Sequence, residues 1–147
     1  MKIYLAGPIK DCTKEEAWRW RERFQQLRPD FDWLIPPDLS DRFELGLLID
    51  EDKVELVRDD RDMISKSDCI IANIWKDSVG TSMEIMLAHE NCVPVILLIE
   101  ERDEASLSPW YTEHADAIVA TKIQAIDRAL ADWHPSLSPR IPRLISG

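Results

Sequence analysis

The sequence lacks the features of several large classes of protein. Its 147 residues contain only 3 cysteines, an odd number without Cys-x-x-Cys or Cys/His spacing, so neither a disulfide framework nor a structural zinc site is expected. Cys69 and Cys92 lie beside apolar runs and are interpreted as small core residues. No apolar run approaches the roughly 20 residues that span a bilayer, and no signal-peptide apolar region follows Met1. We therefore expect a cytoplasmic protein without a membrane partner.

Basic residues are scarce relative to acidic ones. Lys and Arg total 18 against 28 Asp and Glu, which gives a formal net charge of −10. Such a charge repels a phosphate backbone, so a nucleic-acid polymer is not an expected partner. A small anionic ligand is compatible with it where backbone N–H groups and a few local donors hold the anion. His89 and His114 have no Cys or carboxylate partner at ligand spacing, so no metal or other cofactor is expected.

Short apolar runs alternate with helical patterns along the chain. Hydrophobic residues make up 45 % of the sequence, enough for a core in one domain of this length. The patterns predict strands at 2–6, 31–35, 69–74, 93–99 and 116–120, and helices at 13–27, 53–67, about 81–91 and 121–133. This alternation is typical of a doubly wound α/β fold, flavodoxin- or Rossmann-like, with a five-stranded parallel sheet. We expect the domain to span residues 1–133 and a proline-rich tail to span 134–147.

The residue patterns of the first and last predicted helices indicate how the first helix begins and which side chains of both are buried. Thr13 and Glu16 fit a capping box at the start of the first helix. Apolar residues at helical spacing are expected to be buried, in the first helix Ala17, Trp20, Phe24 and Leu27, and in the last Ile123, Ile126, Leu130 and Trp133. Residues 38–52 have no clean period, and their position after a strand would let them cover the ligand-binding edge of the sheet.

The stretch 79–91 is expected to place a carboxylate at that edge. Gly80 would make the tight turn after a strand, with Thr81 or Ser82 as the N-cap of the following helix. Glu84 then lies in the first helical turn, beyond the carboxyl end of a central strand, where open α/β sheets bind their ligands. The alternative is structural, because Thr81-Ser82-Met83-Glu84 also fits a capping box in which Glu84 reaches back to Thr81.

Asp60 is the second unusual carboxylate. It projects from the middle of an apolar arc of the helix at 53–67, which consists of Leu56, Val57, Met63 and Ile64. A lone carboxylate facing the interior is costly unless it is paired, hydrogen-bonded or protonated. The alternative is an ion pair with Arg58 or Arg61 at the helix surface.

Glu84 and Asp60 can converge on one cleft, because their helices flank the same strand. Paired carboxylates in different environments are the usual equipment for breaking a glycosidic bond, one remaining ionised and the other holding a proton. The helix N-terminus favours an anionic Glu84, whereas apolar neighbours are expected to raise the pKa of Asp60.

Two short loops are candidate anion sites. Gly7-Pro8-Ile9-Lys10, after the first strand, could present backbone N–H groups and one cation. Ser78-Val79-Gly80-Thr81 is the better candidate, because N–H groups and hydroxyls converge there. Neither loop matches Gly-x-Gly-x-x-Gly, so dinucleotide binding has little support.

Several motifs occur in a specific order along the chain. They are Ile-Tyr-Leu-Ala-Gly-Pro-Ile at 3–9, Asp60-x-x-x-Ile64-x-x-Ser67-Asp68, Asn73, Val-Gly-Thr-Ser-Met-Glu at 79–84, and Leu-Ser-Pro-Trp at 107–110 with His114. Their order and spacing resemble the nucleoside 2-deoxyribosyltransferase-like family, to which 2′-deoxynucleoside 5′-phosphate N-hydrolases are related. The resemblance implies a doubly wound parallel sheet, a small nucleoside or nucleotide as substrate, and a homodimer or higher homo-oligomer whose active site takes a residue from the neighbouring subunit.

The resemblance also implies roles for individual residues. Glu84 would be the nucleophile that attacks the anomeric carbon, releases the base and leaves a covalent deoxyribosyl-enzyme. Asp60 would be the general acid/base, and Tyr4 would orient the nucleophile. The substrate would contact a further set of residues, namely Gly7, Ile9, Asn73, Ser78, Gly80 and, from the adjacent subunit, Ser108.

The acceptor of the sugar distinguishes the enzymes of this group. Transferases pass the sugar to a second base, which is our main interpretation, and the hydrolases pass it to water. Transferases resemble each other in an aspartate two residues before the motif glycine, where this chain has Ser78, with Asp77 one residue earlier. The hydrolases use serine there to bind a 5′-phosphate, which a carboxylate would repel.

Two further functions are compatible with the same residues. One is a nucleotide-binding domain that keeps the fold without the activity. The second is a flavodoxin-like enzyme that binds a phosphate-sugar, which would be indicated if Asp60 is exposed and paired with an arginine.

Overall fold

A parallel sheet of five strands lies at the centre of the protein. The computed structural model describes residues 1–36 and 49–131. Within these residues the strands are β1 (Lys2–Ala6), β2 (Asp32–Leu34), β3 (Cys69–Asn73), β4 (Val95–Leu98) and β5 (Ala117–Val119). They pair in the order β2-β1-β3-β4-β5, and every pairing is parallel. The predicted doubly wound sheet is confirmed.

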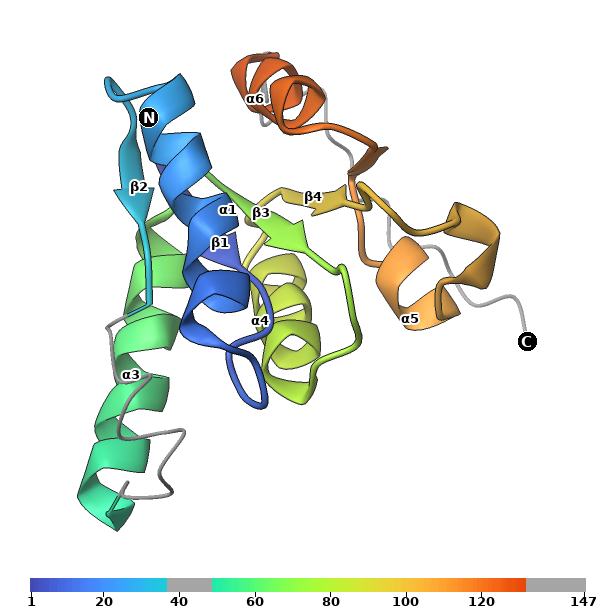
Figure 1. Ribbon diagram of the computed structural model, residues 1–147. Helices are drawn as coiled ribbons and strands as arrows, with labels where there is room; N and C mark the ends of the chain where they lie inside the picture. The colour runs from blue at the N-terminus through green and yellow to red at the C-terminus, as the bar shows by residue number, and fades with distance from the viewer. Residues whose placement is uncertain (37–48, 132–147) are drawn as a thin grey trace.

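Helices cover both faces of the sheet (Figure 1). On one face, α1 (Lys14–Leu27) and α6 (Lys122–Leu130) pack against Ile3, Leu5 and Ile71. On the other face, α3 (Asp50–Lys66) and α4 (Val79–Glu90) pack against Tyr4, Ala6 and Ala72. Alternate residues of a strand point to opposite faces, so the parity of a position decides which helices its side chain meets.

Two short helices follow β4, in a segment for which the sequence patterns predicted neither a helix nor a strand. They are the 3-10 helix η1 (Glu104–Ser106) and α5 (Pro109–Thr112), and Ser108 caps α5 by accepting from the N–H of Trp110. No helix in the described part of the chain is both long and apolar enough to cross a membrane.

The first helix has the predicted start and the predicted buried face. The Thr13 hydroxyl accepts from the N–H of Glu16 at 3.1 Å, and the Glu16 carboxylate accepts from the N–H of Thr13 at 2.9 Å, so the capping box is confirmed. The predicted stripe faces the sheet, with Ala17, Trp20 and Phe24 buried and Leu27 partly buried. The same face also contains Arg21, which is completely buried and which the apolar pattern did not include.

Some of the other predicted core positions are wrong. Ile123 and Leu130 of α6 are 54 % and 46 % exposed, because the helix turns its small residues Ala125 and Ala129 to the sheet and so approaches it closely. Val57 of α3 is 53 % exposed.

The two cysteines beside apolar runs have different environments. Cys69 is buried as predicted, but Cys92 is exposed. Cys92 has a φ of 58° and lies in the turn after α4, so the chain reverses there before β4 begins. Trp133, the tail at 134–147 and most of the predicted loop at 38–52 lie outside the described residues.

Candidate active site

A cleft of about 610 Å³ lies where β1 and β3 end, beside α3 and the first turns of α4. The segments after the two strands line it, as the position of ligand sites in open α/β sheets predicts. Most of the residues predicted for the site line this cleft, namely Gly7, Ile9, Asp60, Ser78, Gly80 and Glu84. The structure therefore brings the two predicted carboxylates together in one cavity of a size that suits a small molecule.

Glu84 is not a capping residue. The N-cap of α4 is Ser78, whose hydroxyl accepts from the N–H of Thr81 at 3.4 Å, so the predicted caps Thr81 and Ser82 lie inside the helix. Glu84 is consequently in the second turn and too far along to close a capping box. Gly80 is helical rather than the tight turn predicted, and a Cβ there would lie 3.9 Å from Glu84 Oε1. The glycine leaves the space in front of that oxygen open.

Tyr4 lies beneath the two carboxyl groups. It is completely buried in β1, and its phenol has a pKa raised above the ordinary value by burial and by the charges of Glu84 and Asp60. Several enclosed polar atoms of the described residues have no hydrogen-bond partner of good geometry, and three of them belong to this group, namely Tyr4 Oη, Asp60 Oδ1 and Glu84 Oε2. Buried polar atoms are normally satisfied, so this cluster fits a site prepared for a ligand.

Burial raises the pKa of both carboxyl groups. The pKa of Asp60 rises to about 6 and that of Glu84 to about 8, in each case mainly because the charged form loses water. The Tyr4 hydroxyl and the distant positive charge of Arg21 lower both values, and the negative charge of Asp60 raises that of Glu84. The predicted rise for Asp60 is confirmed. The expected bias of Glu84 toward its anion is wrong in this structure, because burial outweighs a helix dipole that fades beyond the first turn.

Asp60 has none of the surface ion pairs considered from the sequence. Arg58 and Arg61 are exposed, and the ion pairs found within the described residues include neither of them with Asp60. Asp60 itself is partly buried on the face of α3 that meets α4. The condition for a phosphate-sugar enzyme, an exposed Asp60 paired with arginine, is therefore not met.

The other end of the cleft is lined by two lysines and two aspartates, namely Lys10, Lys76, Asp11 and Asp77. Lys10 and Lys76 line it together with Ser78 and the N-terminus of α4. Lys76 donates to the Asp11 carbonyl at 3.1 Å. The nearby carboxylate of Asp77 accepts from Arg102 at 2.9 Å, which neutralises its charge. Helix N–H groups, a hydroxyl and two ammonium groups form an arrangement that can hold an anion.

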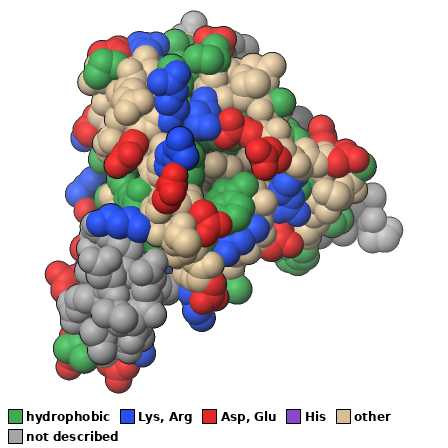
Figure 2. All heavy atoms as spheres, viewed as in Figure 1, with side chains coloured by type: hydrophobic (Ala, Val, Ile, Leu, Met, Phe, Trp, Pro, Cys, Tyr) green, Lys and Arg blue, Asp and Glu red, His purple; other side chains and the backbone are tan. Residues whose placement is uncertain are grey.

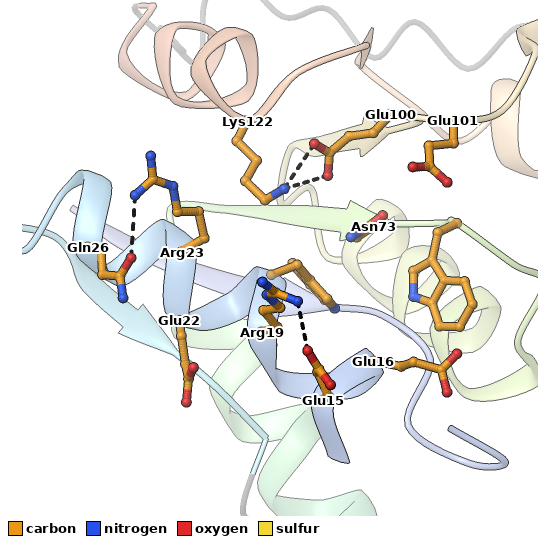
Figure 3. Close-up of a pocket in the computed structure, with 12 residues that line it drawn as sticks. Glu15, Glu16, Arg19, Glu22, Arg23, Gln26, Asn73, Glu100, Glu101 and Lys122 are labelled. Carbon is orange, nitrogen blue, oxygen red and sulfur yellow. Dashed lines mark hydrogen bonds and ion pairs between the residues drawn. The ribbon is translucent and has the colours of Figure 1, made fainter. Parts of the chain in front are cut away.

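Asn73 and Ser108 lie outside this cleft. Asn73 has the same strand parity as Ile71, so it points to the α1/α6 face and lines a second cavity of about 850 Å³ there. Figure 2 shows this face, where acidic and basic side chains surround a hollow, and Figure 3 shows Asn73 between α1 and the segment of Glu100 and Glu101. Ser108 lines a separate depression of about 440 Å³ with Trp110 and Met83.

Arg21 is a residue near the site that the sequence analysis missed. Its side chain reaches the end of β1, where it donates to the carbonyl of Gly7 at 3.1 Å. The spacing contained a usable signal, because position 21 lies four residues after Ala17 and three before Phe24, within the buried stripe. Gly7 itself has no room for a side chain, since a Cβ there would lie 2.5 Å from the Trp20 ring.

The residues of the cleft do not form a metal site. No group of three or more His, Cys, Asp or Glu side chains in the described part of the chain could hold a metal ion. The chemistry available in the cleft is that of two carboxyl groups with raised pKa values, a buried phenol and a helix N-terminus that can hold an anion.

Comparisons with known proteins identify the fold. No protein-family model and no curated protein matches the sequence. Among solved structures, a 2-deoxyribosyltransferase from Bacillus psychrosaccharolyticus is similar with a TM-score of 0.68 and 19 % identity, over 90 % of this chain and 93 % of that one. A conserved protein from Enterococcus faecalis V583 is similar with a TM-score of 0.65 and 17 % identity, over 87 % and 96 % of the two chains. A CMP N-glycosidase from Clostridium botulinum follows with a TM-score of 0.53 and 15 % identity, over 87 % and 97 %. The chain thus has the fold that these two enzymes share.

Proposed function

We propose that this protein cleaves the N-glycosidic bond of 2′-deoxynucleosides or their 5′-monophosphates and transfers the sugar to another nucleobase. The observation that carries the proposal is the convergence of Glu84 and Asp60 in one cleft above the buried hydroxyl of Tyr4. Two carboxyl groups in different environments supply the nucleophile and the proton that glycoside cleavage requires. The similarity in fold to a 2-deoxyribosyltransferase supports the same reaction.

The reaction proceeds as a double displacement. An oxygen of ionised Glu84 attacks C1′, the bond from C1′ to the base nitrogen breaks, and protonated Asp60 gives its proton to the departing base. A nitrogen of the second base then attacks C1′ and releases Glu84, while its proton returns to Asp60. Tyr4 orients the Glu84 carboxylate, and Gly80 leaves space beside Oε1 for the sugar.

This mechanism requires one proton on the carboxyl pair. With pKa values of about 6 and about 8, the pair holds a single proton between these limits. The mechanism places this proton on Asp60 and the negative charge on Glu84 once substrate is bound. A base whose leaving nitrogen lies beside Asp60 supports this placement.

Hydrolysis of a 5′-monophosphate is the second candidate function. It is supported by Ser78 at the N-terminus of α4 with Lys10 and Lys76 beside it, and by the pairing of Asp77 with Arg102, which offsets a negative charge at that end of the cleft. A phosphate dianion interacts favourably with these donors. Water would then replace the second base as the acceptor, with Asp60 taking its proton.

The decisive experiment is a chromatographic substrate panel. The protein is incubated with deoxynucleosides and deoxynucleoside 5′-monophosphates, with and without free adenine, beside the variants Glu84→Gln and Glu90→Gln. Glu90 is the matched control, because it lies on the same helix and is exposed. We expect a new nucleoside that forms only when adenine is present, a loss of at least about 1,000-fold in Glu84→Gln, and full activity in Glu90→Gln.

The remaining outcomes each have a definite meaning. Free base released from monophosphates alone would establish the hydrolase. Ligand binding without base release, unchanged in Glu84→Gln, would establish a non-catalytic nucleotide-binding domain and contradict both reactions.

A further inference from the structure

Arg21 is buried in α1 without a carboxylate partner. It is 0 % exposed, and the ion pairs within the described residues do not include it. Its guanidinium lies over the Trp20 ring at 4.4 Å from the centroid, and its pKa is lowered to about 10 by burial. Burying a cation without a direct counter-ion lowers the stability of the fold, so packing alone does not explain why an arginine is present here.

The hydrogen bonds of Arg21 connect α1 to the end of β1. Nε donates to the Leu5 carbonyl at 3.2 Å, Nη2 donates to the Gly7 carbonyl at 3.1 Å, and Nη1 donates to the Ala17 carbonyl. Leu5 follows Tyr4 directly, and Gly7 lines the cleft. The rigid fork of the guanidinium therefore fixes both the strand that presents the Tyr4 hydroxyl and the loop at the floor of the cleft.

The positive charge of Arg21 lowers the pKa of both carboxyl groups in the cleft. Among the charges around Arg21, that of Glu84 has the largest favourable effect, and in return Arg21 lowers the pKa of both Glu84 and Asp60. From the other elements, Tyr4 of β1 and Asp60 of α3 also act on Glu84. The remaining charged groups of the cleft lie along its lining, namely Lys10, Asp11, Lys76 and Asp77. Arg21 differs from these because it is fixed and shielded from solvent, so salt screens its effect little.

We propose that Arg21 is a positioning residue of the active site, which braces the end of β1 beneath the carboxyl pair and supplies a permanent positive charge that favours ionised Glu84. The kinetic consequence rests on the proposed function, but the electrostatic one does not. Lysine can replace the charge but not the three-carbonyl fork, and glutamine can replace part of the hydrogen bonding but not the charge. The two substitutions therefore separate the two roles.

The experiment measures the titration of the Glu84 carboxyl directly. Glutamate is labelled with ¹³C at the carboxyl carbon, its NMR signal is assigned with Glu84→Gln, and Arg21→Gln, Arg21→Lys and Arg23→Gln are compared with the wild type. Arg23→Gln is the matched control, since it removes a positive charge from the same helix but is exposed. We expect the Glu84 carboxyl to titrate about one pH unit higher in Arg21→Gln than in the wild type. In Arg21→Lys and Arg23→Gln it should titrate as it does in the wild type.

Two readouts complete the test. Arg21→Lys is expected to melt at a lower temperature than the wild type despite its unchanged titration, because the fork is lost. On the substrate identified by the panel, the acid limb of the pH profile of kcat should move upward in Arg21→Gln, with little change in KM.

The proposal is overturned if the Glu84 carboxyl titrates at the same pH in Arg21→Gln as in Arg23→Gln. It is also overturned if Arg21→Lys raises the pH of this titration by about as much as Arg21→Gln does. Should Arg21→Gln fail to fold, Arg21→Met removes the charge in its place and is compared with Arg23→Gln in the same way. A wild type that releases no base would contradict the proposed function and leave the NMR result valid.

Discussion

Glu84 shows how burial at a reactive site acts against stability. Its carboxyl is enclosed in the second turn of α4, and burial raises its pKa to about 8, so near neutral pH the folded protein binds a proton which the unfolded chain releases. The unfolded value is near 4.5. Proton uptake on folding makes stability fall as the pH rises between these two values. An ionised Glu84 is therefore reactive and destabilising for the same physical reason.

We predict that Glu84→Gln is more stable than the wild type, by an amount that grows with pH. Glutamine has no charge to bury, so the difference should be close to zero at pH 4.5 and reach roughly 2–4 kcal/mol at pH 8. Chemical denaturation at several pH values from 5 to 8.5 measures it. Glu90→Gln, on the exposed end of α4, should show no such trend. A difference that stays constant over this range would contradict the assigned burial of the carboxyl.

Single residues differed in how well the sequence predicted them. Asp60 was found because an acidic position within an apolar arc conflicts with its surroundings, and the structure shows that conflict as a raised pKa. Arg21 was missed although it occupies the buried stripe of α1, because an arginine on a helix is read as a solvated residue. Its burial depends on backbone carbonyls of β1 that only the fold brings near.

At the scale of elements, the start of α4 decides the chemistry of one end of the cleft. Apolar runs predicted β1 correctly, and the capping box predicted the start of α1. The start of α4 was placed too late, because three hydroxyl residues, Ser78, Thr81 and Ser82, compete for the cap and sequence alone does not rank them. The earlier cap moves Glu84 into the second turn and puts the Ser78 hydroxyl in the cleft.

We predict that the N-caps Ser78 and Thr13 contribute equally to stability, but that only Ser78 contributes to substrate binding. Ser78→Ala and Thr13→Ala each remove one side-chain cap and should each cost about 1 kcal/mol of stability. Ser78→Ala should in addition raise KM for a 5′-monophosphate roughly tenfold, because it removes a donor to a charged group. Steady-state kinetics and denaturation of both variants test this. Equal KM values in the two variants would remove Ser78 from the substrate site.

At the scale of the whole molecule, the sheet order separates residues that the sequence had grouped. Strand alternation sends Asn73 to the α1/α6 face, away from Glu84, and the segment after β4 carries Ser108 to its own depression. A motif gives the order of residues along the chain but not the face or the subunit to which each belongs. Ser108 could meet a substrate only if a second copy brought its own Ser108 to this cleft.

An exposed apolar patch indicates where a second copy would bind. Val79, Met83 and Trp110 are 79 %, 69 % and 70 % exposed, and Met83 and Trp110 line the depression that contains Ser108. Val79 and Met83 are one helical turn apart on α4, next to the cleft. Apolar side chains gathered in this way mark interaction surfaces, and a symmetric contact here would bring each Ser108 toward the partner's α4.

We predict that the protein is a homodimer or larger and that Met83→Glu separates it into monomers with reduced activity, because a carboxylate cannot be buried in an apolar contact. Sedimentation velocity gives the assembly state, and the substrate panel gives the activity at the same protein concentration. Ile123→Glu is the matched control, since Ile123 is 54 % exposed on α6, across the sheet from the patch. A monomeric wild type, or an unchanged assembly in Met83→Glu, would exclude this surface and with it a role for Ser108 in the neighbouring cleft.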